Sequence, residues 1–549
     1  MRSSFVLLGV LSCLGHLCRG SDYFSSITGL EELLQTEDFL LRNLRTTTNA
    51  VRTSLQQLES ELSSIEQEHA VAAKDTENYL TNPVNVYRLM KRLHTDWPHL
   101  EGRVQQIADR IDFNVTQKGD GLSFPSQEDV DGAALALVRL QSTYKLDVAQ
   151  VAAGILNGIK YGSDMSWQDC FVLGQQLFEM EDYNNTKVWL RESMERLGRH
   201  SHSPSPSASA SASASPASAS IPDSGTLNRM EAVAKSLFQL GDFDTAYELS
   251  QRVLQFDPKR IRNWHLGDKG AATTPEEAED MALPRHSDSY SLTQEFAHYE
   301  KVCRGEVGPS PRQERPLRCR YSQGSHPYRR LAPLKLEEHS LDPFVVTYHD
   351  MLSPRKVSDL RLMAVPRMHR STVNPLPGGQ NKKSSFRVSK NAWLAYDSHP
   401  TMGGMLSDLS DATGLDMTFC EQLQVANYGV GGHYEPHWDF FRDPSHYPAE
   451  EGNRMATAIF YLSDVEQGGA TAFPFLNFAV KPQLGNVLFW YNVHRSLDVD
   501  YRTKHAGCPV LKGSKWIGNV WIHEATQTFA RPCDVFRDHE VSLEYEIIK

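Results

Sequence analysis

An α+β chain of several domains is predicted, with a helical N-terminal part and a β-rich C-terminal part. Residues 22–75 are almost free of Gly and Pro and carry a heptad-like spacing of apolar residues. Two helix pairs follow within residues 163–262, and after residue 339 short runs rich in Val, Phe, Tyr, Ile and Trp alternate with turn residues. At 549 residues the chain exceeds what one hydrophobic core usually supports, so about three or four domains are expected.

Residues 1–20 have the pattern of a secretory signal peptide. Arg2 precedes an apolar run from Phe5 to Leu17, and the small residue Gly20 follows. No later segment reaches the roughly 20 apolar residues that cross a bilayer, so no membrane span is expected. A net charge of -12 provides no basic surface for nucleic acid, which is therefore not expected as a partner.

Residues 21–160 are predicted to form a helical N-terminal region. Apolar residues recur there with the alternating spacing of three and four that a heptad repeat has, at Leu41, Leu44, Val51, Leu55, Leu58, Leu62 and Ile65. Thr48 interrupts this seam, and the run is short. Two structures therefore stay open: a helical hairpin within one chain, and a dimerising coiled coil between two chains.

The helix pairs within residues 163–262 are typical of a peptide-binding helical domain. They cover residues 167–197 and 227–256, with breaks near Asp182 and Gly241. The second pair has the small and aromatic residues, the turn and the closing Pro of a tetratricopeptide repeat, whose concave surface suits an extended peptide. An ordinary helical hairpin is the alternative.

Irregular segments separate the helices from the β-rich domain. A Ser/Ala-rich insert at 201–225 has almost nothing to bury and is predicted to be disordered. Residues 263–338 are predicted to be a linker, 339–533 the β-rich domain and 534–549 a C-terminal tail. The repeated short strands of the β-rich domain predict a β-sandwich or jelly roll. One helix interrupts them and begins near Ser353 or Pro354.

The stretch HYEPHWD, residues 433–439, holds the candidate metal site. Successive side chains of a strand point to opposite faces, so His437 and Asp439 would share one face. This spacing also occurs elsewhere in the chain by chance. The surrounding strand pattern and a third ligand therefore decide whether it marks a metal site. His505 is the best third ligand downstream, and Lys515 begins a strand-like run, KWIGNVWIHE, whose alternate residues include His523.

Two imidazoles and one carboxylate on one face leave three positions of an octahedral ion open, as in mononuclear non-haem Fe(II) oxygenases. A bidentate 2-oxo acid can take two of these positions and dioxygen the third. Lys515 would then pair with the remote carboxylate of the 2-oxo acid, since a buried cation is costly unless an anion meets it. A structural zinc site would be closed and would more often use cysteine thiolates.

Four stretches resemble the catalytic alpha subunit of collagen prolyl 4-hydroxylase: QVANYGVGGHYEPHWDF, EGNRMATAIFYLSDVEQGGATAFP, GNVLFWYNV and HAGCPVLKGSKWIGNVWIHE. The resemblance covers nearly the whole chain after the signal peptide. It implies a double-stranded β-helix (jelly-roll) oxygenase domain in which His437, Asp439 and His505 hold Fe(II). Lys515 is implied to bind the remote carboxylate of 2-oxoglutarate.

Other residues take implied roles from the same resemblance. Tyr428 and Thr471 match positions that line the 2-oxoglutarate pocket, and His523 matches a histidine near it. For His523 a strand histidine bonded to the backbone is the alternative. The helix pairs depart from the family pattern, because Ala232, Lys235 and Phe238 stand where tyrosines or other aromatics are common. This departure is expected to affect which peptides the helical domain prefers.

The family resemblance also implies the reaction, which is 4-hydroxylation of the proline before Gly in procollagen repeats. 2-Oxoglutarate and O2 would be co-substrates, Fe(II) the metal and L-ascorbate the reductant that restores oxidised iron. Protein disulfide isomerase would be the beta subunit of an α2β2 heterotetramer in the endoplasmic reticulum lumen. A related oxygenase acting on a non-collagen peptide and a non-catalytic collagen-binding subunit are the alternatives. The sequons at Asn114 and Asn184 fit a lumenal glycoprotein.

Six cysteines follow the signal peptide: Cys170, Cys303, Cys319, Cys420, Cys508 and Cys533. In an oxidising compartment these predict a few structural disulfides, and the sequence alone leaves all pairings open. The resemblance implies two bonds, Cys303–Cys319 and Cys508–Cys533. Cys170 matches an unpaired cysteine of the family, and Cys420 is an addition to the family pattern.

Overall fold

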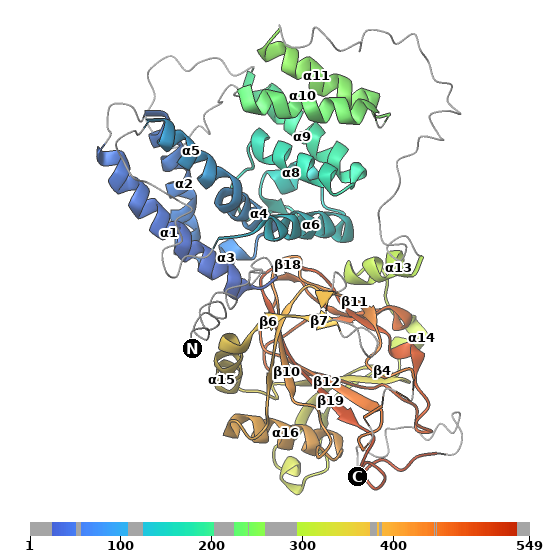
Figure 1. Cartoon of the computed structure of the whole chain (residues 1–549). Helices are drawn as coiled ribbons and strands as arrows, with labels where there is room; N and C mark the ends of the chain where they lie inside the picture. The colour runs from blue at the N-terminus through green and yellow to red at the C-terminus, as the bar shows by residue number, and fades with distance from the viewer. Residues whose placement is uncertain are drawn as a thin grey trace, which may run out of the picture. The chain divides into compact units, whose positions relative to one another are not determined.

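The computed structural model describes residues 25–50, 56–107, 124–201, 224–239, 241–258, 294–373, 382–383, 387–443, 445, 447–448 and 450–534. The predicted signal peptide, nearly all of the Ser/Ala-rich insert and nearly all of the C-terminal tail lie outside these residues. Two compact units divide the chain: Met1–Ala133 with Val307–Lys549, and Ala134–Glu306. Figure 1 shows the helices and strands of both units.

The first unit begins with helices, in agreement with the prediction. They are α1 (Ile27–Ala50), α2 (Gln56–Lys74), α3 (Thr76–Leu80), α4 (Pro83–Lys91), the π-helix η1 (Arg92–Asp96) and α5 (Trp97–Ile107). Asn82 caps α4 through its side chain, and Pro83 occupies the first helical position, where a missing N–H costs nothing.

Helices α1 and α2 lie antiparallel. Glu37 contacts His69 at 3.2 Å, and Arg45, eight positions further along α1, contacts Glu66 at 2.7 Å. The heptad positions that the structure describes are buried, namely Leu41, Leu44, Leu62 and Ile65. The seam therefore closes a hairpin within the chain, which was one of the two open alternatives. Residues 51–55 of the seam lie outside the described residues.

A buried ionic cluster ties this hairpin to η1. The Arg92 guanidinium donates to Glu37 at 2.8 Å and to Glu68 at 2.9 Å. Tyr79 donates its hydroxyl to the same Glu68 at 3.2 Å. All four side chains are buried. The two carboxylates are stabilised by the arginine, because an unpaired buried charge costs several kcal/mol.

The second unit contains the two predicted helix pairs. Its elements are the end of α6 (Gln127–Tyr144), α7 (Val148–Ala152), β1 (Ile155–Leu156), β2 (Ile159–Lys160), α8 (Trp167–Glu179), α9 (Tyr183–Ser201), α10 (Ser224–Gln239), α11 (Phe243–Phe256) and α13 (Gln294–Cys303). The breaks fall where the sequence predicted them. One continuous core joins the pairs, with Phe171 and Leu190 from the first and Val233 and Leu249 from the second.

The β-rich part of the first unit is a sandwich of two antiparallel sheets, as a jelly roll requires. The larger sheet runs in the order β3 (Cys319–Ser322), β4 (Leu334–Leu341), β5 (Phe344–His349), β16 (Val487–Tyr491), β12 (Arg454–Tyr461), β19 (Lys515–His523), β10 (Leu423–Tyr428), β9 (Lys390–Leu394), β6 (His369–Arg370). The smaller sheet runs in the order β11 (Tyr434–His437), β17 (His505–Gly507), β14 (Thr471–Phe473), β15 (Phe478–Val480).

Apolar side chains from both sheets meet between them, including Ile459 and Ile517 from the larger sheet and Phe473 and Val480 from the smaller. Two short strand pairs flank the sandwich, β13 (Gln467–Gly468) with β18 (Val510–Lys512) and β7 (Thr372–Val373) with β8 (Lys382–Lys383). The helices beside it are α14 (Pro311–Glu314), α15 (Pro354–Ala364) and α16 (Pro400–Thr413). Ser353 caps α15, as predicted.

The larger sheet starts earlier than the sequence predicted. Strands β3 and β4 belong to it, although 263–338 was expected to be a linker. The Lys and Glu residues in β4 obscured the run of apolar residues by which the other strands were predicted.

The cysteine pairings that the resemblance implied are wrong. Cys319 and Cys533 are exposed free thiols, so neither Cys303–Cys319 nor Cys508–Cys533 forms. Cys303 and Cys508 are both disulfide-bonded. Cys508 is buried, whereas Cys533 is exposed. Closeness in sequence did not decide the pairing.

Candidate functional site

The three predicted metal ligands meet at the smaller sheet. His437 ends β11, Asp439 follows two residues later, and His505 begins β17, which pairs with β11 at these two histidines. Their candidate ligand atoms lie within 4.8 Å of one another. Asp439 Oδ1 is 3.6 Å from His437 Nε2, and Asp439 Oδ2 is 3.5 Å from His505 Nε2. Asp439 lies beyond the end of the strand, which the prediction had placed within it.

Backbone carbonyls orient both imidazoles. The Nδ1 atom of His437 is 2.7 Å from the Glu435 carbonyl oxygen, and that of His505 is 3.1 Å from the Thr503 carbonyl oxygen. An Nδ1–H that donates to a carbonyl leaves Nε2 as the lone-pair donor, directed at the shared point. Both histidines are therefore held in the tautomer that a metal needs.

Asp439 is held in the ionised form by its surroundings. Burial alone would raise its pKa, but the adjacent His505, His437 and Arg454 side chains lower it below the usual value. Thr457 donates its hydroxyl to Asp439 Oδ2 at 2.8 Å. Burial, with His505 beside it, lowers the pKa of His437 to about 3. A carboxylate and a neutral imidazole are the protonation states that bind a cation.

Lys515 faces the same cavity from the larger sheet. Its side chain is buried, with the residue 3% exposed, and Nζ lies 3.4 Å from the Thr471 hydroxyl. Nζ is 5.8 Å from the centre of the Tyr428 ring. Among the described residues no carboxylate forms an ion pair with it, and burial lowers its pKa to about 7. A buried lysine without an anionic partner in the described part of the protein is suited to bind the anionic group of a ligand.

The cavity brings together six of the seven predicted site residues. Its lining includes His437, Asp439, His505, Lys515, Tyr428 and Thr471. Because β10 and β19 are neighbours, Tyr428 lies directly opposite Lys515. The cavity has metal ligands on one wall and a buried cation on the other, which fits one ligand with two separate anionic ends.

His523 does not line this cavity. It is fully buried, with Nδ1 3.0 Å from the Gly452 carbonyl oxygen and Nε2 3.1 Å from Glu421 Oε1. Glu421 accepts from Arg454, whose NH1 in turn donates to the Asp439 carbonyl oxygen at 3.3 Å. Its placement favours the backbone-bonded alternative, extended by this chain of contacts towards Asp439.

Several residues at the site were not predicted from the sequence. Thr457 is a single buried polar residue in the otherwise apolar run MATAIFYL, and that exception is a usable signal. Tyr434 stacks on His437 with ring centroids 3.6 Å apart. Buried Arg387 lies 4.9 Å above the Tyr434 ring and donates to Gln424 at 2.6 Å. Its strand partner is far away in sequence, so no local pattern indicates this contact.

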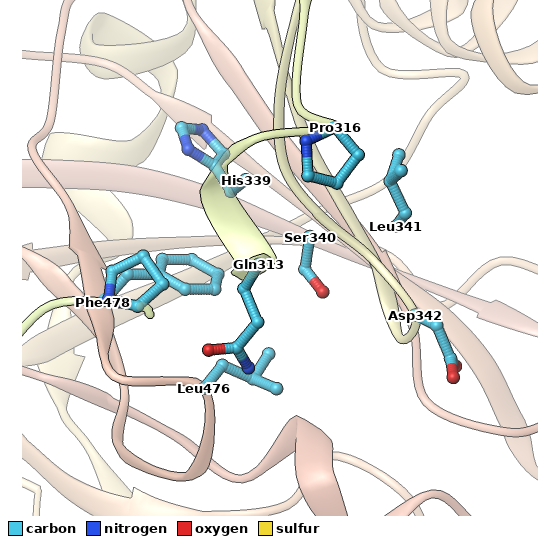
Figure 2. A pocket seen from close by; sticks show the side chains of 9 residues that line it. Gln313, Pro316, His339, Ser340, Leu341, Asp342, Leu476 and Phe478 are labelled. Carbon is cyan, nitrogen blue, oxygen red and sulfur yellow. The ribbon is translucent and has the colours of Figure 1, made fainter. Parts of the chain in front are cut away.

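A larger cavity lies elsewhere on the same domain. Figure 2 shows its lining, which includes Gln313, Pro316, Leu476 and Phe478. Its volume is about 160 Å³, against about 30 Å³ for the cavity at the triad. His339 stacks on Phe478 there, but no set of metal ligands converges in the described lining. The metal ligands and the buried lysine therefore identify the smaller cavity as the site. A ligand that binds there must widen the cavity.

The jelly-roll sandwich, the His-Asp-His triad and the buried lysine define a 2-oxoglutarate- and Fe(II)-dependent oxygenase. The family model for the 2OG-Fe(II) oxygenase superfamily matches residues 423–523, which include all three triad residues and Lys515. A second model, for the N-terminal region of the prolyl 4-hydroxylase alpha subunit, matches residues 26–158.

Full-length relatives identify the family more closely. The human prolyl 4-hydroxylase subunit alpha-1 is 35% identical over 529 residues, which cover 93% of this chain and 95% of the relative. The chicken (Gallus gallus) subunit alpha-2 is 37% identical over 519 residues, with the same coverage, and the Caenorhabditis elegans subunit alpha-2 is 33% identical over 543 residues. The chain belongs to the family of prolyl 4-hydroxylase alpha subunits.

Among solved structures, the viral collagen prolyl hydroxylase of Paramecium Bursaria Chlorella virus-1, in complex with 2OG, is 26% identical. The match covers 33% of this chain and 95% of the viral chain, with a TM-score of 0.27. At that score the structural likeness adds nothing to the assignment, which rests on the full-length relatives.

Proposed function

We propose that this chain is the catalytic alpha subunit of a procollagen-proline 4-dioxygenase. Lys515 carries the proposal, because it is a buried lysine with no carboxylate partner among the described residues and it shares one cavity with His437, Asp439 and His505. A metal site alone would fit many reactions. A cation opposite an open-sided triad fits a ligand that chelates the metal at one end and carries a carboxylate at the other.

The residues present fit Fe(II) and 2-oxoglutarate. Two neutral nitrogen donors and one carboxylate would hold the metal, and Lys515 with Thr471 and Tyr428 would bind the remote carboxylate of 2-oxoglutarate. Bound Fe(II) supplies the oxidising power with which O2 hydroxylates a proline at C4 while 2-oxoglutarate is converted to succinate and carbon dioxide. L-ascorbate would restore iron that has been oxidised without substrate.

The protein's own contribution is orientation and exclusion of water. Thr457 and the carbonyls of Glu435 and Thr503 fix the ligand side chains before the metal arrives. Trp490 and Phe473 pack against His505 with ring centroids 4.6 and 5.9 Å away. A dry and rigid wall keeps the reacting atoms of metal, co-substrate and peptide in place. His523 would act through Glu421 and Arg454 as a positioning residue.

The substrate proposal is the proline before Gly in collagen-type repeats. Residues 163–262 would bind the extended peptide as a tetratricopeptide-like domain. Phe238, Phe243 and Tyr247 are 37%, 44% and 45% exposed on its second helix pair, and exposed aromatic side chains suit proline-rich chains. Residues 21–160 would be the region that pairs two alpha subunits.

The remaining proposals concern assembly and location. Protein disulfide isomerase would be the beta subunit of an α2β2 heterotetramer in the endoplasmic reticulum lumen, and residues 1–20 would direct the chain there. Part of residues 263–338 would link the helical part to the oxygenase domain, 339–533, whose larger sheet also takes β3 and β4 from that stretch, with 534–549 as a tail. None of the helices that the structure describes is long and apolar enough to cross a membrane.

The test is mass spectrometry of a Pro-Pro-Gly repeat peptide incubated with the chain co-expressed with protein disulfide isomerase, together with Fe(II), 2-oxoglutarate and ascorbate. We expect one added oxygen on the proline before Gly and an equal amount of succinate, both absent for His437→Ala. Succinate without an oxidised peptide would indicate an oxygenase with another substrate. Peptide binding without any succinate would favour a non-catalytic collagen-binding subunit.

A further inference from the structure

The helical N-terminal region contacts the oxygenase domain within the first unit, and these contacts surround the start of the strand that carries Lys515. The residues just before α1 lie at one side of this strand end. The C-terminal end of α3 lies at the other. Both helices come from a region with none of the predicted site residues. Their contacts with the strand end that carries Lys515 are therefore not explained by the site itself.

Asn427 makes the first of these contacts. It is fully buried on β10 next to Tyr428, and alternation along the strand turns it away from the cavity. Its Oδ1 accepts the backbone N–H of Ile27 at 3.2 Å. Its Nδ2 donates to the Ser514 hydroxyl at 2.9 Å and to the Lys515 carbonyl oxygen at 3.4 Å. One amide thus joins the start of α1 to the backbone of Lys515.

A backbone bond supports the same junction. The N–H of Gly429, just past the end of β10, donates to the Ser25 carbonyl oxygen at 3.1 Å. Ser25 is fully buried. The chain before α1 is therefore fixed to the end of β10 by both backbone and side chain.

Lys512 makes the second contact, three residues before Lys515. Its side chain is fully buried, and Nζ donates at 3.0 Å to the Asn78 carbonyl oxygen, to the Asn78 side chain and at 3.0 Å to the Thr81 hydroxyl. Asn78 is the middle residue of α3, and Thr81 caps the C-terminal end of this helix. Nζ also lies 3.5 Å from Glu466 Oε2 of the oxygenase domain, so Lys512 joins the helical region to that domain.

Only Gly513 and Ser514 separate the two fixed points. Gly513 has φ of +104°, a backbone conformation that side chains rarely adopt, so the chain turns sharply into β19. Strand ends open more readily than strand centres when nothing covers them. Ser463 holds this strand end from within the oxygenase domain, through Ser514 and Trp516, and Asn427 and Lys512 add braces from the helical region.

We propose that the helical N-terminal region sets the affinity of the enzyme for its 2-oxo acid co-substrate, with Asn427 and Lys512 as positioning residues for Lys515. This rests on the proposed function, in which Lys515 binds the remote carboxylate. The helical region is on this view a part of the co-substrate site as well as an assembly region. The alternative is that these contacts only hold the two regions together.

The sharpest variant is Ile27→Pro. Proline removes the N–H that Asn427 accepts, and it is tolerated at the first position of a helix, which Ile27 occupies. Ile27→Val keeps the N–H and controls for the smaller side chain. Asn427→Ala removes the whole brace. Asn486→Ala is its matched control, since Asn486 is also a buried asparagine with three side-chain hydrogen bonds and does not line the cavity.

The measurement is calorimetric titration of 2-oxoglutarate into the full complex loaded with Mn(II) in the absence of O2, with a separate titration of Mn(II). For Ile27→Pro and Asn427→Ala we expect the 2-oxoglutarate Kd to rise about tenfold or more, because a small misplacement of a binding group is costly. The Mn(II) Kd should stay within about twofold, as should both constants for Ile27→Val and Asn486→Ala.

Lys512→Met tests the second brace by the same titrations, with Lys512→Arg as the variant that keeps the charge. An unchanged 2-oxoglutarate Kd in Ile27→Pro and Asn427→Ala would overturn the inference. So would an equal loss of Mn(II) and 2-oxoglutarate affinity in all folded variants, which indicates general loosening. Wild-type complex that binds Mn(II) but not 2-oxoglutarate would instead refute the proposed function.

Discussion

Binding of 2-oxoglutarate should depend on pH because Lys515 is buried. Removal from water lowers the pKa of Lys515 to about 7, from 10.5 for an ordinary lysine. Between these values the ligand-free cavity holds a neutral amine, whereas a bound carboxylate favours the ammonium form. Binding above pH 7 must therefore take up a proton.

The free-energy cost of keeping Lys515 charged in the ligand-free cavity follows from the folded and unfolded pKa values. They differ by about 3.5 units, 10.5 minus 7, which corresponds to about 5 kcal/mol at about 1.4 kcal/mol per unit. The 2-oxoglutarate Kd should rise about tenfold for each pH unit above 7 and level off below it. In the ligand-free protein the folded pKa lies below the unfolded one. Lys515 therefore destabilises the fold progressively as the pH falls from 10.5 towards 7.

The assay is calorimetric titration of 2-oxoglutarate into Mn(II)-loaded complex at about pH 6.5, 7.5 and 8.5, in buffers of different ionisation enthalpy. The buffer dependence of the heat gives the number of protons taken up, which should approach one at the highest pH. Lys515→Met keeps the length of the side chain without the charge and should bind weakly at every pH. Equal wild-type Kd values at the lowest and highest pH, without proton uptake, would refute the reasoning.

Three further predictions concern the metal and the fold. Thr457→Val removes the hydroxyl that donates to Asp439 and should weaken metal binding about 10–100-fold, measured by competition with a chelator; an unchanged affinity would show that the bond is dispensable. Arg92→Met removes the arginine that pairs with both Glu37 and Glu68, leaving Glu68 with Arg88 and Glu37 with His69, and should lower the free energy of unfolding by about 3–5 kcal/mol in denaturant titrations; a smaller loss would mean that Arg88 and His69 compensate. Chelation of the metal should abolish hydroxylation, and Fe(II) but not Zn(II) should restore it, because only iron supports the redox step.

The local features of the oxygenase domain could be predicted from the sequence. Alternating β-branched and aromatic runs predicted the strands. The spacing of His437 and Asp439 and a downstream histidine predicted the triad, although Asp439 lies beyond the end of its strand. Lys515 was predictable because a lysine in an apolar strand needs an anion. Each of these signals lies within a short stretch of chain.

Contacts between distant stretches were not predictable. Nothing near Cys303 or Cys508 in the sequence indicates which thiols remain free. Arg387 reaches Tyr434, and Asn427 reaches the N–H of Ile27, through pairings that only the folded sheet creates. His523 shares the strand face predicted for Lys515, yet it lies at the other end of β19 and faces Glu421 instead. Two residues on the same face of a strand can therefore lie in different environments, because the strand is long and its ends have different neighbours.

The central claim is that Lys515 and the triad serve one co-substrate in one cavity. It is tested most directly by hydroxylation of a Pro-Pro-Gly peptide over a range of 2-oxoglutarate concentrations, for wild-type complex and Lys515→Ala. We predict a KM for 2-oxoglutarate raised about a hundredfold or more, as expected for loss of a buried charged partner, with the KM for the peptide unchanged. Equal 2-oxoglutarate dependence in the two proteins would contradict the claim.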